Sequence, residues 1–549
     1  MGKWVNGAGI AALVAFAVYL RVDALAGPNY WYDEAITSLR VAGHTERQVA
    51  AYATAHPIFA LGDLEQFVSV SPATGYADTV HSLTTEDPQH TPLYYVMARA
   101  WASMLGNSVA AGRGLAALAS ILALPAMYWL CLELFVRSGA FASRLVCWLG
   151  VTAMALSPFQ VAMAREHREY SLLTLTFAIA CASFLRALRR QDAAGWALFA
   201  VAMTATVYTH MVSLLGLGAC AAFLLVRERF RLSRPVLGFT AASVACGLAF
   251  VPWLLVLRAG RNTATSGLGW VQNFSQGRLQ FGFSFDPVLR VSDISVWEID
   301  KLIQGLPAYR LTHWIYELTP MLILITIWRL GRPGQRSCAG FATALICSVS
   351  LTLFIADFFT GSTSGWAYRY STTSNLGWLL ALAMVMAAAM EHSGRWKTPG
   401  RAAVGIFVLI AGWSAWVTHE QRHTWAKAFD NDAEIADSLS IDSQANLLTD
   451  DFVGGILALR PQTRADLPVS WRPRCYTCAR VLEPLLDIPN IPGTTGQFYY
   501  FRSWINVPAN RLQPLIDTMA GDRLGDPRFH TQLIRLTDPS SSFFLLTPR

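Results

Sequence analysis

Long stretches of apolar residues that contain no charge restrict the fold of this sequence more than any other feature. Val236 to Leu257 and Ser374 to Met390 are two such stretches, and about 20 residues of this kind cross the hydrocarbon core of a bilayer. Only 14% of the 549 residues are charged and 53% are hydrophobic, whereas about 25% of the residues of a soluble domain are charged. The sequence therefore predicts an all-α polytopic membrane protein.

Eleven stretches are predicted membrane spans, with twelve or thirteen as alternatives if shorter apolar stretches also cross. They cover approximately residues 7–24, 114–136, 145–162, 170–187, 194–209, 211–226, 236–257, 313–330, 338–357, 374–390 and 402–418. The first stretch also resembles a secretory signal, since Lys3 precedes it and the small residues Ala24-Leu25-Ala26 end it. Under both interpretations the chain from about residue 26 begins on the outer side.

Basic residues concentrate in the short loops between these spans, and such loops are retained on the cytoplasmic side of a membrane. The residues concerned are Arg137, Arg144, Arg186, Arg189, Arg190, Arg227, Arg229, Arg231, Arg234, Arg329, Arg332, Arg336, Arg395, Lys397 and Arg401. This distribution explains the formal net charge of +7 without a nucleic-acid partner. We expect a multi-pass membrane protein with the remaining loops on the outer side.

The outward-facing segments define the domains. Residues 1–418 are predicted to form a transmembrane catalytic domain whose first external loop is 26–112 and whose long external loop is 258–312. Within the first loop, Pro92 to Leu105 carries Arg99 and is too short for a crossing, so we expect an external amphipathic helix in the interface.

The polar tail 419–549 is predicted to be an external soluble domain of α/β type. At about 130 residues it is long enough to fold alone, and 445–449 and 543–547 have the composition of short strands. Its Cys475 and Cys478 predict a local disulfide or free thiols, because two ligands are too few for structural zinc.

Adjacent carboxylates follow the first predicted span in Tyr30-Trp31-Tyr32-Asp33-Glu34. One interpretation is that both acids stabilise the first turn of a helix. The other is that Asp33 is a general base that accepts a proton from an attacking hydroxyl, while Glu34 orients Asp33 or holds a cation. The sequence at this point leaves both open.

A second polar cluster, residues 86–92, precedes the predicted interfacial helix. Glu86 and His90 have side chains that bind a divalent cation or a sugar hydroxyl. The alternative is a turn punctuated by proline that carries an N-cap. A divalent cation is therefore one candidate cofactor, and no other cofactor is indicated.

Five ionisable residues occur in a row at 165–169, before another predicted span. Helical spacing would place Arg165, Arg168 and Glu169 on one side. Guanidinium groups bind phosphate through several donors at once, so these arginines suggest a lipid phosphate, with a solvated run of mutually paired charges as the alternative.

Two further residues lie in predicted external loops. His210 stands between closely spaced spans, where a histidine is more often structural than catalytic. Arg369 is flanked by aromatic residues in Tyr368-Arg369-Tyr370, and either binds phosphate or extends toward lipid headgroups.

Together these motifs resemble the polyprenyl-phosphate-dependent membrane glycosyltransferases of the C superfamily (GT-C), near the protein O-mannosyltransferases of glycosyltransferase family 39 and the lipid A aminoarabinose transferase. The matching segments, in chain order, are Asp33-Glu34, then His90-Thr91-Pro92-Leu93, then Glu166, Arg168, Tyr170 and Leu172, and finally Arg369-Tyr370. Thr91 replaces the first proline of the family's proline pair, and His210 stands where some relatives carry a basic residue.

The resemblance implies a GT-C-like fold and inverting transfer of a hexose or pentose from a polyprenyl-phosphate donor in the membrane. The acceptor would be a glycan, a lipid or a protein on the outer face, with Asp33 as general base. The resemblance further implies the inner cell membrane of a bacterium, with the active site and the C-terminal domain on the periplasmic side. The resemblance also implies two binding sites. The donor-phosphate site would comprise Arg165, Arg168, His210 and Arg369. The substrate site would comprise Glu166, Tyr170 and Tyr370.

A membrane transporter or lipid flippase is the alternative function, since many spans with occasional charges also fit that class. A transporter predicts ionisable residues near the centres of spans and discontinuous helices. The charges singled out above lie at the predicted external ends instead.

Overall fold

The structure is a computed structural model. It describes residues 2–261, 322–329, 333–360, 368–391, 397–420, 432–443, 445–449, 453–471, 498–503, 529–534 and 541–548. Cys475, Cys478 and nearly all of the predicted external loop 258–312 lie outside the described residues.

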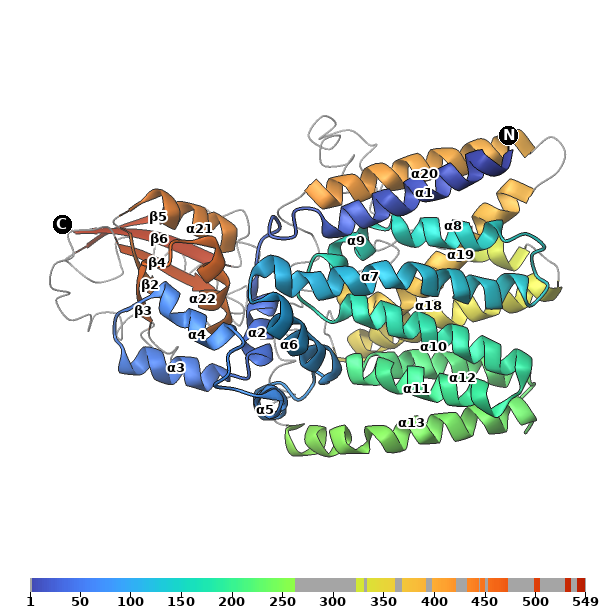
Figure 1. Ribbon diagram of the computed structural model, residues 1–549, viewed down its shortest axis with the longest axis horizontal. Coiled ribbons are helices and arrows are strands. Elements are labelled where there is room, and N and C mark those ends of the chain that lie inside the picture. Colours follow the sequence, from blue (N-terminus) through green and yellow to red (C-terminus); the bar gives the residue numbers. More distant parts are fainter. Residues whose placement is uncertain are drawn as a thin grey trace.

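Helices aligned with the long axis form a bundle, and a smaller unit with a β-sheet caps one end of it (Figure 1). The bundle helices are α1 (Gly2–Val22), α7 (Val109–Cys131), α8 (Leu145–Ala155), α9 (Pro158–Ala164), α10 (Tyr170–Arg190), α11 (Ala193–Thr209), α12 (Ser213–Arg227), α13 (Arg234–Ala259), α18 (Pro333–Thr360), α19 (Thr372–Glu391) and α20 (Lys397–Glu420). A π-helical turn, η2 (Leu132–Val136), extends α7.

Helices that fit a membrane are identified by length and composition. Within the described residues, five are long and apolar enough to cross, or six if the bent pair α8 and α9 is one span. α1, α11 and α12 are shorter apolar helices. Ten of the eleven predicted spans overlap helices of the bundle, although 145–162 is divided between two of them. Of the span 313–330, the structure describes only 322–329, which are helical.

The predicted span 145–162 is broken rather than continuous. α8 ends at Ala155 and α9 begins at Pro158, with a bend of 58° between them. Ser157 caps α9 by accepting a hydrogen bond from the Gln160 backbone N–H. Pro158 occupies the first helical position, where its missing N–H leaves no bond unmade. The Ser-Pro pair therefore starts a new helix within an apolar stretch.

Close backbone packing holds the inner helices together. A Cβ atom on Gly377 of α19 would lie 2.8 Å from the Ala342 carbonyl oxygen and 2.8 Å from the Ile346 nitrogen of α18. Small residues at such crossings let membrane helices approach closely. The surrounding interior is apolar, with Leu345, Trp378 and Leu379 fully buried.

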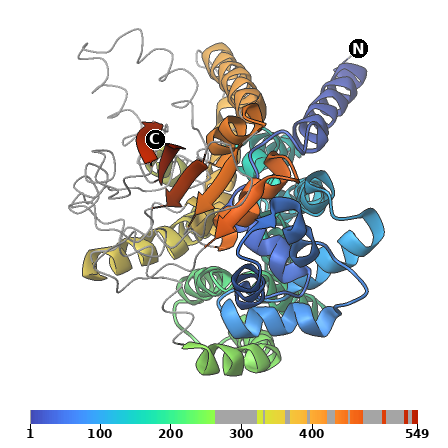
Figure 2. The same cartoon turned by 90° about the vertical axis from the view of Figure 1, so that its left-hand side faces the viewer.

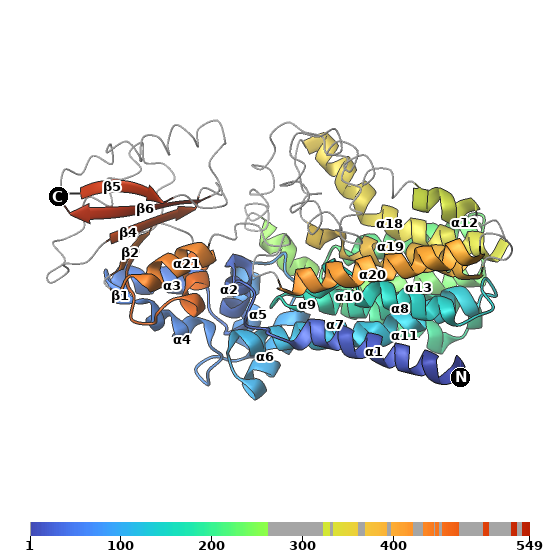
Figure 3. The same ribbon diagram turned by 90° about the horizontal axis from the view of Figure 1, so that it is seen from above.

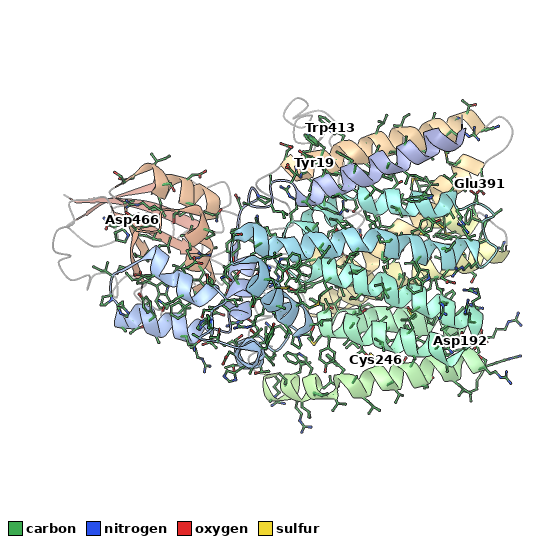
Figure 4. All side chains as sticks on the ribbon, in the orientation of Figure 1. Tyr19, Asp192, Cys246, Glu391, Trp413 and Asp466 are labelled. Carbon is green, nitrogen blue, oxygen red and sulfur yellow. The ribbon has the colours of Figure 1, made fainter. Side chains whose placement is uncertain are left out.

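The predicted cytoplasmic loops share one end of the bundle, far from the sheet. Glu133 accepts hydrogen bonds there from Arg189 and Arg137, and Gln335 donates to the Ala140 carbonyl. Asp192 and Glu391 lie at this same end, whereas Asp466 lies in the capping unit (Figure 4). The loops expected to be external in the described part therefore meet at the opposite end.

The capping unit combines two distant parts of the chain. Residues 26–112 contribute α2 (Tyr32–Val41), α3 (Glu46–Ala55), β1 (Phe59–Ala60), η1 (Leu61–Leu64), α4 (Glu65–Val68), α5 (Tyr76–Glu86) and α6 (Leu93–Leu105). The tail contributes α21 (Asp432–Ile441), β2 (Asn446–Thr449), α22 (Val453–Leu459), η7 (Arg460–Gln462), β3 (Pro468–Trp471), β4 (Phe498–Ser503), β5 (Phe529–Ile534) and β6 (Ser541–Pro548). β2 covers all but the first residue of the predicted strand 445–449, and β6 contains the predicted strand 543–547.

The described strands form a mixed sheet of order β1-β3-β2-β4-β6-β5 (Figure 2). β2 is parallel to β3 and β4, and the other pairs are antiparallel. The edge strand β1 comes from the first external loop, with Phe59 opposite Val469.

The predicted boundary at residue 419 therefore divides segments that pack as one unit. Leu39, Val49 and Leu61 of the first loop share one buried cluster with Leu457 and Val469 of the tail. The tail does not build this core alone, because the first loop supplies one side of it.

Helix α6 corresponds to the predicted interfacial helix. Its 13 residues are too few for a crossing. Arg99 is buried and donates to the Val41 carbonyl oxygen at the end of α2 and to Thr79 Oγ1 of α5, so it fastens α6 to both helices. Gly106, with a φ of 89°, ends the helix. α2, α5 and α6 lie between the sheet and the bundle (Figure 3).

Candidate functional site

The two adjacent acids in the first turn of α2 point into different surroundings. The Glu34 side chain is fully buried, and its two carboxylate oxygens accept hydrogen bonds of 2.7 Å from Nε and Nη2 of Arg113. The backbone N–H of His167 donates to Glu34 as well, at 2.8 Å. Glu34 thus fixes α2 against α7 and the α9–α10 turn. Both oxygens are engaged, which disfavours the expected role of Glu34 in holding a cation.

Asp33 faces a residue more than three hundred positions away. Its Oδ2 lies 2.5 Å from Nη1 of Arg369, in the 3-10 turn η5 (Tyr368–Ser371) that precedes α19. The Asp33 side chain is 21% exposed and that of Arg369 is 10% exposed. The Arg369 guanidinium also lies over the Trp31 ring, 5.2 Å from its centre.

Arg168 adds a second buried guanidinium next to Asp33. Its Nη1 donates to Thr37 Oγ1 at 2.9 Å and to the Asp33 carbonyl oxygen at 3.4 Å. Its Nη2 lies 3.2 Å from Nε2 of His90. Because arginine only donates, His90 accepts through Nε2 and carries its proton on Nδ1. That proton points toward Asp87 Oδ1, 3.8 Å away.

Glu169 is a member of this cluster to which the sequence alone gave no role. Its Oε1 lies 3.4 Å from Arg168 Nη2 and 4.0 Å from Nε2 of both His90 and His210. Burial raises the pKa of Glu169, but the positive charge of the neighbouring Arg168 outweighs burial and brings the pKa below its ordinary value. Burial lowers the pKa of His210 to about 4. Glu169 is therefore ionised and His210 neutral at pH 7.

Two aromatic side chains complete the group. Tyr170 and Tyr370 lie against His210, with ring centres 5.9 Å and 6.3 Å from that of the imidazole. We call the whole set the Asp33 cluster: Asp33, His90, Arg168, Glu169, Tyr170, His210, Arg369 and Tyr370. Its two carboxylates balance its two guanidiniums, and it lies where the bundle meets the capping unit.

Buried polar atoms without a hydrogen-bond partner among the described residues gather in and beside this cluster. They include Trp31 Nε1, Gln89 Oε1, His90 Nδ1, Thr91 Oγ1, Arg168 Nε and Glu169 Oε2. Most buried polar groups in proteins are paired with protein or water. Such a concentration indicates a place where water or a polar ligand binds.

Arg165 does not join the Asp33 cluster. It donates to the carbonyl oxygens of Asp23, Ala24 and His419, and so ties the ends of α1 and α20 together. The reason is local: residues 165–169 form a turn between α9 and α10, with Arg168 N bonded to the Glu166 carbonyl, rather than the expected helix. Glu166, in the same turn, is 2% exposed.

The expected metal ligands Glu86 and His90 are not brought together. Glu86 accepts from Arg40 Nη1 at 2.6 Å and from the Glu46 backbone N–H at 2.7 Å, in a network that also includes Asp87. Among the described residues, no group of three or more His, Cys, Asp or Glu side chains is placed to hold a metal ion. Glu86 and His90 therefore do not form a divalent-cation site with the other described residues.

A separate cavity of about 270 Å³ lies between the chain after α1 and the tail. It is lined by residues 26–30, Val109, Ala436, Asp437, Pro461 and Gln462. None of the residues predicted for the site lines this cavity.

Comparison with known proteins gives similar structures but no matching sequence family. No protein-family model matches the chain, and no curated protein sequence matches it significantly. ArnT from Cupriavidus metallidurans in the apo state is 14% identical, with a TM-score of 0.49 over 99% of this chain and 98% of that chain.

Two further solved structures give similar values. ArnT from the same organism bound to undecaprenyl phosphate is 13% identical, with a TM-score of 0.47 over 99% and 98% of the two chains. The archaeal oligosaccharyltransferase AglB from Archaeoglobus fulgidus, with an inhibitory peptide and a dolichol-phosphate, is 11% identical with a TM-score of 0.46, covering 85% of this chain and 65% of its own. These similarities concern the path of the chain alone.

Proposed function

We propose that the protein is a membrane glycosyltransferase that uses the Asp33 cluster to move a sugar from a polyprenyl-phosphate donor to an acceptor on the outer side of the membrane. The observation that carries the proposal is the ion pair between Asp33 and Arg369, with Arg168 beside it. A partly exposed carboxylate and two guanidiniums meet at the end of an apolar bundle. Such a place suits a ligand with a lipid tail and a polar phosphate-sugar head.

The two arginines are the proposed phosphate ligands. Guanidinium groups bind phosphate oxygens through paired N–H donors, and Arg168 Nε has no partner among the described residues. Fixed positive charge at the departing phosphate would stabilise the charge that develops in the transition state. Neutral His210 would add a further N–H donor, and Tyr170 and Tyr370 would pack against the donor.

Asp33 is the proposed general base. In a single displacement the acceptor oxygen forms its bond to the anomeric carbon while the bond from that carbon to the phosphate oxygen breaks. Asp33 takes the hydroxyl proton, the lipid phosphate leaves with the electron pair, and the anomeric configuration inverts. The donor phosphate must first draw Arg369 away from Asp33, which links donor binding to release of the base.

Glu34 and Arg165 are proposed as positioning residues. Glu34 holds α2 through Arg113, and Arg165 holds the ends of α1 and α20. The acceptor, a glycan, lipid or protein, would approach from the capping unit.

The test is transfer of labelled sugar from polyprenyl-phosphate sugars by the purified protein. Asp33→Asn should lower the transfer rate by about 10²- to 10⁴-fold, the usual contribution of a general base. Asp466→Asn is the matched control, because this carboxylate is 79% exposed in the capping unit. Equal transfer rates for Asp33→Asn and wild type would refute the assignment.

A transporter or flippase is the second candidate, favoured by the bend of 58° between α8 and α9. Broken helices with polar groups mark transporter sites, and Gln160 of α9 pairs with Asn375 of α19 at 2.9 Å inside the bundle. A flippase would move labelled lipid across vesicle membranes without cleaving the sugar. Lipid movement that Gln160→Leu abolishes and Asp33→Asn preserves would support this candidate.

A further inference from the structure

The carboxylate of Glu169 has one oxygen that nothing in the described part of the chain binds. The residue is 1% exposed, and its Oε2 is buried without a hydrogen-bond partner. The neighbouring donor, Arg168 Nη2, contacts Oε1 instead, at 3.4 Å. Glu169 therefore presents an unused acceptor inside the Asp33 cluster.

The imidazoles on either side do not donate to Oε2 of Glu169. His210 Nδ1 accepts from the Val212 backbone N–H at 3.2 Å, so the proton of the neutral ring is on Nε2. That proton points toward Oε1 of Glu169, at 4.0 Å. His90 Nε2 accepts from Arg168 and carries no proton. Both histidines therefore leave Oε2 of Glu169 unbound.

The chemistry of the missing partner follows from these contacts. An ionised carboxylate only accepts hydrogen bonds, so the partner must carry an O–H or N–H. A phosphate oxygen would be repelled. The cluster already balances its two carboxylates with two guanidiniums, which favours a neutral partner over a cationic one. A neutral hydroxyl satisfies both conditions.

We propose that Glu169 Oε2 accepts a hydrogen bond from one hydroxyl of the donor sugar and thereby selects donors that carry this hydroxyl. The inference rests on the proposed function and names its specificity residue. A donor phosphate bound to Arg168 would hold the sugar beside Glu169. Two adjacent residues would then recognise the phosphate and the sugar of the donor.

The inference is tested by binding of defined lipids to the full-length protein in nanodiscs. The probes are undecaprenyl phosphate alone, undecaprenyl-phosphate glucose, mannose and arabinose, and the single deoxy analogues of the sugar that binds best. The variants are Glu169→Gln, and Glu169→Asp, which keeps the charge but withdraws it. Glu228→Gln at the opposite end of the bundle is the control.

We expect Glu169→Asp to bind undecaprenyl phosphate like wild type, and Glu169→Gln to bind it at least as tightly, because the amide removes a negative charge beside Arg168. In both variants the affinity for the glycosylated lipid, relative to that for the bare lipid, should fall by about tenfold or more, because hydrogen bonds to charged groups contribute roughly 10- to 100-fold. One deoxy analogue should bind wild type and Glu169→Gln equally well, and it identifies the hydroxyl. This pattern supports the proposal.

Other patterns overturn it. If both variants retain the wild-type preference for the glycosylated lipid, Glu169 does not contact the sugar. If bare and glycosylated lipids lose affinity by the same factor, Glu169 acts only by holding Arg168. If wild type binds no lipid phosphate and transfers no label, the proposed function fails, and this inference fails with it.

Discussion

Replacing Asp33 by asparagine should tighten the binding of undecaprenyl phosphate while it slows transfer. In the structure Asp33 Oδ2 lies 2.5 Å from Nη1 of Arg369, so this guanidinium is already paired with a carboxylate. A donor phosphate must compete with Asp33 for this guanidinium and also approaches a negative charge. Asparagine removes both the competition and the repulsion. The phosphate should therefore bind Arg369 more tightly, although the general base is lost.

The size of the effect follows from the exposure of the pair. Two unit charges at 4 Å attract by about 4 kcal/mol at an effective dielectric constant near 20, whereas exposed ion pairs contribute about 0 to 1 kcal/mol. Asp33 and Arg369, at 21% and 10% exposure, lie between these limits. We expect a gain of about 1.4 kcal/mol, which is tenfold in affinity.

The assay is a titration of the protein in nanodiscs with undecaprenyl phosphate, at low and at high salt. The gain should shrink as salt screens the charges. Asp466→Asn, which removes an exposed carboxylate of the capping unit, should bind like wild type. Unchanged or weaker binding by Asp33→Asn would show that Arg369 does not hold the phosphate.

Three further predictions follow from the contacts of the site. Glu34→Gln should cost about 3–5 kcal/mol of stability, because it leaves Arg113 as an uncompensated buried charge; an unchanged thermal midpoint would contradict this. Arg165→Ala should lower the midpoint but leave lipid-phosphate affinity intact, whereas Arg168→Ala should weaken that affinity by about tenfold or more; the reverse pattern would make Arg165 the ligand. Burial lowers the pKa of His167 to about 4 in the folded protein, whereas a histidine in the unfolded chain has a pKa of about 6.5. Between these two pH values the unfolded state therefore binds a proton that the folded state does not. Stability should therefore fall by about 3 kcal/mol as the pH drops from 6.5 to 4, and His167→Gln should remove this part of the pH dependence of the midpoint.

The helices of the bundle were predictable because their apolar stretches are long and continuous. Residues 236–257 lie inside α13 and 374–390 inside α19. The break at Pro158 was not predictable, since a proline within an apolar stretch is also compatible with one kinked helix. The sequence pattern shows how long and how apolar a stretch is, but not whether the chain changes direction within it.

The meeting of Asp33 with Arg168 and Arg369 was predictable from the order of the spans, which puts their loops at one end. The division of labour within each motif was not. Successive helical residues point about 100° apart, so Asp33 faces the cluster while Glu34 faces Arg113. Arg165 diverges from Arg168 because the intervening residues turn instead of forming a helix.

The shared core of the capping unit lay beyond the reach of the sequence. β1 has only two residues, and its partner β3 is some four hundred positions away. Neither the alternation of a strand nor the spacing of a turn is visible in so short a segment. A boundary drawn from composition therefore separated what packing unites.

This pairing sets the order in which the molecule can be made. Phe59 finds Val469 only after the last helix of the bundle has been synthesised. Until then Leu39, Val49 and Leu61 lack the tail side chains that cover them. A chain that stops during translation before residue 432 would keep its membrane helices yet expose these apolar side chains. Quality-control proteases could use this exposure to distinguish unfinished copies from finished ones.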